Sequence, residues 1–377
     1  MRTPTLTVAL TALVLAATAA CSSEPTEGNA AVVGGPITVE ATDTSCTVAR
    51  TRAAAGTIEF TVRNTGSKVN EFYVYGEGDQ ILGEVENLTP GLTRSFHVEV
   101  ATPGTYQTAC KPGMKGDGIR GDFTVTGATS SQAPDAAMAT AVADYQEFVS
   151  AQADALLART TEFVDLVKAG KVADAKKAYP LARGPWERIE PVAESFGDLD
   201  PKIDGREDVV EEGMQFTGFH RLEKDLWASG LQPDTSVVAD QLLVDVKEIV
   251  AKAKAVTLNP LQLANGSKAL LDEVATGKIT GEEDRYSHTD LYDFDENVKG
   301  SKAAIDALRP VLKARDAALL ATIDSRFAAL DTALDAHRTD TGFESYTALS
   351  PAEVKALAVA LDAVSEPISK VAAVVAK

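Results

Sequence analysis

The stretch from residue 35 to residue 127 alternates apolar and polar residues over short segments. Alternation runs through residues 57–62, 72–74, 96–100 and 122–126, and each segment would place its apolar side chains on one face of a strand. Asn-Thr-Gly and Pro-Gly sequences between the segments are turn signals. Short strands joined by turns are typical of a small β-sandwich or a Greek-key barrel. The pattern therefore predicts a small β-sandwich domain here.

Beyond residues 128–135, whose Ser, Thr, Ala and Pro content indicates a linker, the hydrophobic period becomes that of a helix. Val142, Val149 and Leu156 recur at intervals of seven residues, as on one face of a long amphipathic helix. Antiparallel helices of this length form bundles. Residues 136–377 are therefore predicted to form an all-α helical bundle. Its further helices are expected at residues 172–195, 207–227, 235–256, 260–276, 293–318, 320–337 and 351–376.

The amino terminus has the features of an export signal. Arg2 precedes an apolar run at residues 6–20, and small residues stand directly before Cys21. The run is too short to span a membrane, and the arrangement resembles a bacterial lipoprotein signal. We predict that residues 1–20 are a lipoprotein signal peptide, that Cys21 is lipidated, and that residues 21–34 form a tether. The alternative is secretion with Cys21 unmodified.

Length and charge narrow the functional classes. At 377 residues the chain exceeds one ordinary hydrophobic core, which supports a multi-domain protein. The net charge is −19, from 55 acidic and 36 basic residues. This balance argues against a nucleic-acid partner, because proteins that bind nucleic acid present a basic face. It is compatible with the handling of cations.

Residues 218–227 hold the clearest candidate for chemistry. His220 and Glu223 are three residues apart, so a helix would place both side chains on one face. Imidazole and carboxylate are both metal ligands, although such a pair alone is more often a hydrogen-bonded surface pair. Glu187 and Glu190 form a second pair at the same spacing, followed by an Asp-rich loop. Bundles build metal sites from such pairs, and oxygen-rich sets favour iron, manganese, calcium or zinc over copper(I).

The β segment carries a second group of candidate ligands. The loop after Cys110 precedes the last predicted strand and contains Met114, a layout that resembles the cupredoxin fold. Glu71 stands where cupredoxins have an upstream histidine, so an ordinary His₂Cys blue-copper centre is excluded. If the cysteines stay reduced, the remaining candidate ligands for copper or iron are Cys46, Glu71, Cys110 and Met114. A Cys46–Cys110 disulfide is the equally open alternative, because these two cysteines remain after the lipidated one.

Three motifs resemble those of the imelysin-like proteins, namely residues 189–198, residues 286–291 and the His-x-x-Glu signature in residues 218–227. A cupredoxin-like domain ahead of an imelysin-like domain is the arrangement of an extracytoplasmic component of bacterial iron-uptake systems. The resemblance implies that His220 and Glu223 bind metal in the bundle. It also implies further ligands, which are one of Glu187 and Glu190, one of Asp200 and Asp204, and, in the β domain, Cys46, Glu71 and Cys110.

The resemblance further implies a function. The chain is expected to be a lipid-anchored protein on the outer face of the cytoplasmic membrane, in the periplasm or cell envelope. It would capture iron, with copper or zinc as further ions, and deliver iron to a membrane permease. A haem-dependent, peroxidase-like protein is the second expected partner. The family is named after a peptidase, but the zinc-protease motif His-Glu-x-x-His is absent, so no enzymatic activity is predicted. The alternatives are a zinc metallopeptidase and a structural or adhesion lipoprotein with a disulfide-stapled β domain.

Overall fold

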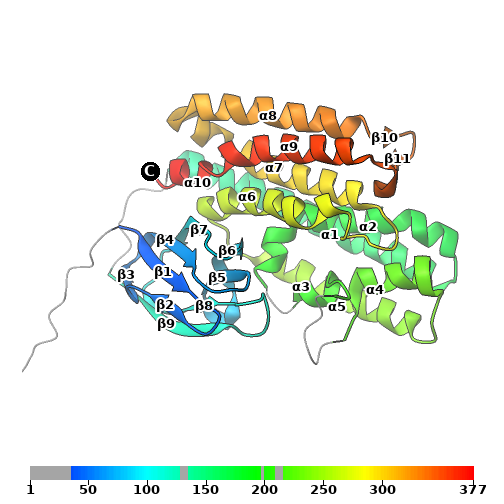
Figure 1. Ribbon diagram of the computed structural model, residues 1–377, viewed down its shortest axis with the longest axis horizontal. Helices are drawn as coiled ribbons and strands as arrows, with labels where there is room; N and C mark the ends of the chain where they lie inside the picture. The colour runs from blue at the N-terminus through cyan, green and yellow to red at the C-terminus, as the bar shows by residue number, and fades with distance from the viewer. Residues whose placement is uncertain (1–34, 128–134, 197–198, 209–214) are drawn as a thin grey trace, which may run out of the picture. The chain divides into compact units, whose positions relative to one another are not determined.

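The structure is a computed structural model, and it describes residues 35–127, 135–196, 199–208 and 215–377. The predicted signal peptide, Cys21, the tether and residues 128–134 of the predicted linker lie outside the described residues. Strands occupy the part before the linker and helices dominate the part after it (Figure 1). The predicted fold class, a small β-sandwich followed by an all-α bundle, is confirmed.

The β domain is a sandwich of two sheets. Its strands are β1 (Ile37–Ala41), β2 (Cys46–Val48), β3 (Arg52–Ala54), β4 (Gly56–Asn64), β5 (Asn70–Tyr75), β6 (Ile81–Leu88), β7 (Thr93–Val100), β8 (Gly104–Cys110) and β9 (Ile119–Thr126). The strand orders are β2-β1-β4-β7 and β3-β9-β8-β5-β6. Phe60, Phe72, Phe96 and Phe123 meet between the sheets, with neighbouring ring centroids 5.3–6.0 Å apart. A shift of one residue in any strand would turn its ring out of this core, so the alternation fixes the register.

Strand β5 is buried on both faces, and this determines where its polar residues lie. Phe72 pairs in register with Cys110 and belongs to the core between the sheets. The neighbouring Tyr73 and Tyr75 point to the other face of the same sheet, where their rings stack at 5.5 Å. Lys111 lies 4.6 Å from the centroid of the Tyr73 ring. Residues that are adjacent in β5 therefore contact different environments.

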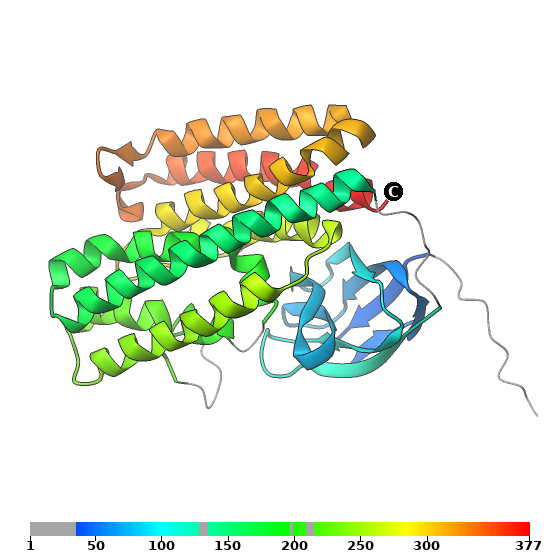
Figure 2. The ribbon, with the colours of Figure 1, turned by 180° about the vertical axis from the view of Figure 1, so that it is seen from behind.

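The helical domain is built around the long helix α1 (Ala136–Lys168), which packs against α2, α5 and α7. Figure 2 shows α1 crossing the domain, with the other long helices roughly parallel or antiparallel to it. The remaining elements are α2 (Val172–Glu194), α3 (Asp200–Ile203), α4 (Gly218–Lys224), α5 (Thr235–Ala255), α6 (Pro260–Thr276), α7 (Asp290–Arg315), α8 (Ala317–Asp335), α9 (Pro351–Ile368) and α10 (Val371–Val375), with the 3₁₀ turn η4 (Lys278–Thr280) and the short hairpin β10 (Arg338–Thr339) and β11 (Gly342–Phe343).

Two predicted helices differ from the observed ones. The helix expected at 207–227 is the short α4 followed by a π-helical turn, η3 (Asp225–Ser229), and residues 209–214 lie outside the description. Gly218 has a φ of +77°, and a Cβ there would lie 2.2 Å from the carbonyl oxygen of Ile203. The chain must therefore turn at Gly218 instead of entering as a helix. The helix expected at 351–376 is divided into α9 and α10.

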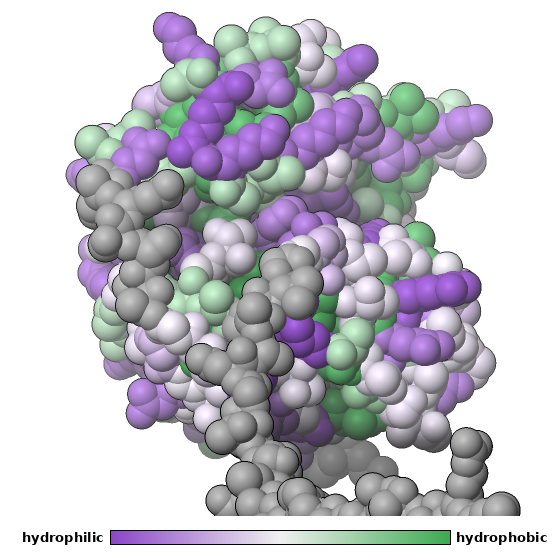
Figure 3. Space-filling model, turned by 90° about the vertical axis from the view of Figure 1, so that its left-hand side faces the viewer, coloured by the Kyte–Doolittle hydropathy of each residue, from purple (hydrophilic) through white to green (hydrophobic). Residues whose placement is uncertain are grey.

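The helices and strands that the structure describes are amphipathic, with their apolar side chains turned towards the cores and their polar side chains towards the surface. On the face seen in Figure 3, polar residues cover much of the coloured surface and apolar ones are scattered between them. In the described part of the chain, no helix has the length and apolar character needed to cross a membrane.

Candidate metal centre

His220 and Glu223 lie inside the helical domain, with exposed fractions of 2% and 0%. The alternative of a surface pair is therefore wrong. His220 Nδ1 lies 3.1 Å from Glu223 Oε2. The other carboxylate oxygen, Glu223 Oε1, accepts hydrogen bonds from the backbone N–H groups of Tyr286 (2.9 Å) and Ser287 (2.7 Å). Glu223 thus fixes the orientation of the imidazole ring through Nδ1, as carboxylates behind metal-binding histidines do.

The opposite nitrogen of the imidazole faces two further carboxylates. His220 Nε2 lies 3.4 Å from Glu283 Oε1 and 3.6 Å from Asp204 Oδ1. It is buried, and no residue of the described chain gives it a hydrogen bond of acceptable geometry. One ligand atom from each of these three residues lies within 4.8 Å of the others. A nitrogen and two carboxylate oxygens at this separation form a ligand set suited to iron, manganese or zinc.

A second grouping uses the Nδ1 side of the same ring, with Glu223 and Asp284. Its atoms already have hydrogen-bond partners. Nδ1 and Glu223 contact each other, and Asp284 Oδ1 accepts a hydrogen bond of 2.9 Å from the Tyr179 hydroxyl. Asp284 Oδ2 accepts from the Thr289 hydroxyl. In the Nε2 grouping, Asp204 Oδ1 also accepts a hydrogen bond, from Arg183, but the nitrogen itself has none. The Nε2 grouping is therefore the better candidate for a metal ion.

Local backbone geometry brings Asp204 to this point. Asp204 follows α3 directly, and its amide bonds to the carbonyl of Asp200. At the next residue, Gly205, a Cβ would lie 2.3 Å from the Pro201 carbonyl oxygen, so only glycine permits this turn. The indole Nε1 of Trp186 donates to Asp204 Oδ2 at 3.2 Å. These contacts aim the other oxygen, Oδ1, towards His220.

A buried arginine lies inside the same cluster. Arg183 on α2 is completely buried and bonds to Asp204, to Glu187 at 2.5 Å and to Asp293 at 3.3 Å. The carboxylates of Glu283 and Asp284 are each 3.7 Å away. Arg183 thus supplies positive charge to five carboxylates, two of which face His220 Nε2.

The predicted ligands Glu187 and Glu190 do not reach His220 Nε2. Lys278, also fully buried, lies 3.2 Å from Glu187 Oε2 and 3.4 Å from Glu190 Oε1. The side-chain nitrogen Nδ2 of Asn297 donates to the carboxylates of Glu187 and Glu190, at 3.1 and 3.0 Å. Burial raises the pKa of Glu190 well above its ordinary value in spite of Lys278. These two residues form a structural ion-pair cluster behind the proposed metal ligands.

The pKa shifts in the cluster link ion binding to proton release. Burial raises the pKa of Asp204 to about 6, against the opposing effects of Arg183 and His220. Burial and Arg183 disfavour the imidazolium form of His220, but the neighbouring carboxylates of Glu223, Glu283 and Asp204 raise its pKa to about 10. Without a metal ion, His220 is therefore protonated at neutral pH. An ion that binds Nε2 must displace that proton.

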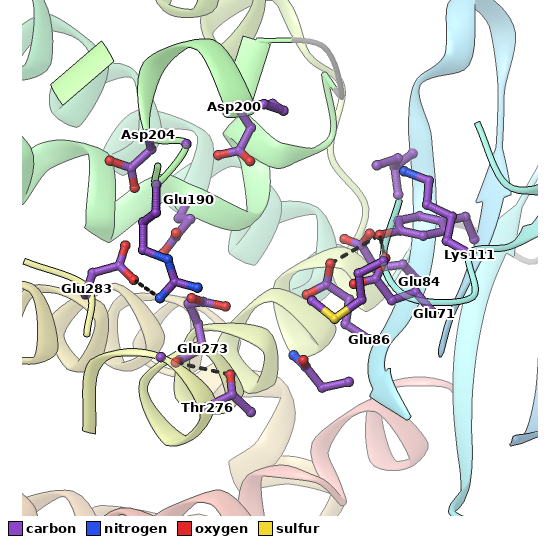
Figure 4. A pocket seen from close by; sticks show the side chains of 18 of the residues that line it. Glu71, Glu84, Glu86, Lys111, Glu190, Asp200, Asp204, Glu273, Thr276 and Glu283 are labelled. Atoms are coloured by element: carbon purple, nitrogen blue, oxygen red, sulfur yellow. Dashed lines mark hydrogen bonds and ion pairs between the residues drawn. The ribbon is translucent and has the colours of Figure 1, made fainter. Parts of the chain in front are cut away.

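Asp204 and Glu283 also line a cavity of about 500 Å³ between the helical domain and the outer face of β5 and β6. Figure 4 shows labelled carboxylates of both domains around it, with Lys111 beside those of the β domain. The carboxylate residues in its lining are Glu71, Glu84, Glu86, Glu190, Asp200, Asp204, Glu273 and Glu283. The predicted ligand Asp200 therefore lies in the cavity wall, where burial raises its pKa to about 7. Asp204 and Glu283 of the Nε2 grouping are thus part of the cavity wall, whereas His220 is not among the lining residues.

The predicted thiolate site in the β domain is wrong for the state seen here. Cys46 and Cys110 form a disulfide, so neither sulfur is a thiolate that could bind copper or iron. Glu71 also lies on the opposite face of the sheet, because its neighbour Phe72 shares the core face with Cys110. There it accepts a hydrogen bond of 2.8 Å from the Tyr73 hydroxyl. Met114, 45% exposed, lines the cavity with Glu71.

Sequence reasoning missed Arg183, Lys278 and Glu283. Glu283 stands in the run Glu-Glu-Asp at residues 282–284, just before the polar motif that the sequence singles out. That run was a usable signal for a third ligand. The two basic residues gave none, because a lone arginine or lysine in a helical segment is usually solvated.

Comparisons of the sequence with models of protein families agree with this two-domain architecture. The model of the imelysin family matches residues 141–371, and that of the cupredoxin-like domain matches residues 8–125. The iron uptake system component EfeO of Escherichia coli O157:H7 is 36% identical over 340 residues, covering 89% of this chain and 90% of its own. EfeO of Yersinia pestis is 37% identical over 341 residues, covering 89% of each. Among solved structures, auracyanin of Roseiflexus castenholzii matches 24% of this chain and 97% of its own, with 20% identity and a TM-score of 0.21. The chain therefore belongs to the imelysin family, in the group with an N-terminal cupredoxin-like domain whose members are named iron uptake system component EfeO.

Proposed function

We propose that this protein is a lipid-anchored component of an iron-uptake system that captures iron outside the cytoplasmic membrane. The names of its relatives support a role in iron uptake and not in enzymatic catalysis. The imelysin domain is peptidase-like in family only, because the sequence lacks the second histidine and the adjacent glutamate of a zinc protease.

The observation that carries the proposal is the buried His220 Nε2, which faces Asp204 and Glu283 without a well-aligned hydrogen bond. Because carboxylate oxygens of both residues lie within 3.6 Å of this nitrogen, a metal ion could replace the imidazolium proton there and be shared with the two carboxylates. Iron would bind through Nε2 and one oxygen from each carboxylate, with Glu223 holding the ring. Zinc accepts the same ligand types and is the main competitor. Copper(I) would prefer thiolate ligands, which the disulfide removes.

Access to this site would run through the acidic cavity. Its lining joins Glu71, Glu84 and Glu86 of the β domain to Asp204 and Glu283 of the metal centre. Clefts lined by charges of one sign concentrate ions of the opposite sign. Burial raises the pKa of these three glutamates of the β domain, so iron would bind to them by displacing protons, in place of a copper centre.

The remaining parts of the proposal concern location and partners. Cys21 would carry the lipid that holds the protein at the outer face of the membrane, and residues 21–34 would tether it there. Bound iron would pass to a membrane permease, and a haem-dependent, peroxidase-like protein would act in the same system. Cys21→Ser should move the protein from the membrane fraction to the soluble fraction of the envelope. Retention of this variant in the membrane fraction would contradict the lipid anchor.

An anaerobic titration with Fe²⁺ tests the metal centre. The full chain is purified as the Cys21→Ser variant, and its iron stoichiometry is compared with that of His220→Gln and His337→Gln in the same background. His337 is a matched control, because it is 7% exposed and its Nδ1 lies 2.8 Å from Glu344 Oε1. We expect one tightly bound iron in the parent and in His337→Gln, and none in His220→Gln. Equal binding by all three would refute the assignment of His220.

A further inference from the structure

Arg183 differs from an ordinary buried ion-pair partner, because it shares its acceptors with the proposed metal site. Its guanidinium bonds to Asp204 and lies 3.7 Å from Glu283. These are the two carboxylates that face His220 Nε2 at 3.6 and 3.4 Å. An ion held by both carboxylates would therefore have a fixed positive charge as its near neighbour.

Arg183 cannot move away into solvent. Its side chain is completely buried, and Glu187 and Asp293 bind it at 2.5 and 3.3 Å in addition to the two carboxylates that face His220 Nε2. The rings of Tyr179 and Phe219 lie on it as well, each with its centroid 5.9 Å from the guanidinium carbon. The charge is permanent, because the guanidinium stays protonated at every pH at which the protein is folded.

We infer that Arg183 is the specificity-determining residue that sets the preference of the site between divalent and trivalent ions, an inference that rests on the proposed function. The repulsion between Arg183 and a bound ion is proportional to the ion's charge. It therefore weakens the binding of a trivalent ion more than that of a divalent one. The same repulsion keeps binding reversible, which a protein that passes its ion onward requires.

Four variants separate the effect of the Arg183 charge from the effect of its packing and hydrogen bonds. Arg183→Gln removes the positive charge, and Glu187→Gln removes a negative charge beside it without touching a proposed ligand. The double variant Arg183→Gln/Glu187→Gln restores the charge balance with a neutral hydrogen-bonding pair. Lys278 keeps Glu190 and Glu273 as partners in each case, at 3.4 and 3.6 Å. Arg183→Lys keeps the charge and loses the planar fork.

The probes are Mn²⁺ and citrate-buffered Ga³⁺, titrated calorimetrically into the full chain carrying Cys21→Ser. The measured quantity is the ratio of the two association constants. We expect Arg183→Gln to raise the Ga³⁺ to Mn²⁺ ratio by about tenfold or more and Glu187→Gln to lower it. The double variant and Arg183→Lys should return it to within about threefold of the parent value.

A ratio that stays constant in every variant, with both affinities falling together, would show that Arg183 is only a scaffold and would overturn this inference alone. If the parent binds neither probe, the proposed metal centre fails and this inference fails with it. If Arg183→Gln does not fold, as judged by circular dichroism, Glu187→Gln and the double variant decide the matter. An unchanged ratio in Glu187→Gln then overturns the inference.

Discussion

The carboxylates around His220 and those on the outer face of β5 and β6 line one cavity but are balanced by different charges. Around His220, the buried cations Arg183 and Lys278 are fixed within 2.5–3.7 Å of their carboxylate partners. On the β domain, Glu71, Glu84 and Glu86 have Lys111 nearby, and burial raises the pKa of Glu84 to about 8. Burial thus raises the pKa of these three carboxylates on the β domain (the outer group). In the group around His220 (the inner group), burial likewise raises the pKa of Asp204, but Lys278, His220 and Arg183 hold the pKa of Glu283 well below its ordinary value. The inner group therefore keeps an ionised carboxylate beside His220 for a metal ion, whereas an ion bound by the outer group must first displace protons.

The largest expected effect comes from removing a fixed cation. Lys278→Met leaves Glu190 buried without its counter-charge and Glu187 with Arg183 alone, which should lower the free energy of unfolding by about 3–5 kcal/mol. Lys111→Met, at the outer group, should lower it by less than about 1 kcal/mol. Urea unfolding followed by tryptophan fluorescence measures both, because Trp186 and Trp227 report on the helical domain. Partial recovery in Lys278→Met/Glu190→Gln is the control, and equal losses in the two single variants would break the contrast.

The disulfide should affect the stability of the β domain and not the binding of iron at the candidate metal centre around His220. Cys46→Ser/Cys110→Ser opens a link between residues 64 positions apart, which should lower the stability of the β domain by about 2–4 kcal/mol. Scanning calorimetry measures this loss, and the Fe²⁺ stoichiometry of the same sample should stay unchanged. Loss of the tightly bound iron would instead mean that the β domain holds it.

The next prediction concerns the orientation of the His220 ring at the candidate metal centre. Glu223→Gln keeps an oxygen for the amides of Tyr286 and Ser287 but weakens the charge behind His220 Nδ1. We expect Fe²⁺ affinity to fall by about 10–100-fold, with little change in the melting temperature. Glu71→Gln, which alters an equally buried carboxylate of the outer group, should leave the affinity within about twofold. Similar losses in both variants would make the two groups a single binding site.

The smallest effect concerns pH. Because the folded-state pKa of Glu84 is raised to about 8 from 4.5, its contribution to stability is present below pH 4.5 and is lost as pH rises through 8. Glu84→Gln should therefore raise the unfolding free energy at pH 8.5 relative to the parent and change it little at pH 4.5. Thermal melts of the metal-free protein at the two pH values measure this. A gain that is equal at both would point to a cause other than proton loss.

Much of the fold could be predicted from the hydrophobic pattern, because period-two and period-seven spacings reflect burial directly. The helix predicted at 260–276 matches α6, and the phenylalanines of the alternating segments meet in the β core. The prediction of a helix at residues 207–227 was wrong because Gly218 lies against the Ile203 carbonyl, a tertiary contact that no periodicity encodes. For the site, His220 was identified from its motif. The separation between His220 and Glu190 could not be predicted from the sequence. It depends on Lys278 and Asn297, which contact Glu190 on α2 from segments later in the chain.

The position of Glu187 between Arg183 and Lys278 has a consequence for how this sequence can change over evolutionary time. Glu187 binds both cations, one on its own helix and one on η4, 95 positions away from the first. Substitutions at the three positions should therefore be epistatic, with each change tolerated only on a background in which a matching change has already occurred. In a collection of related chains, Arg183, Glu187 and Lys278 should be replaced together or not at all.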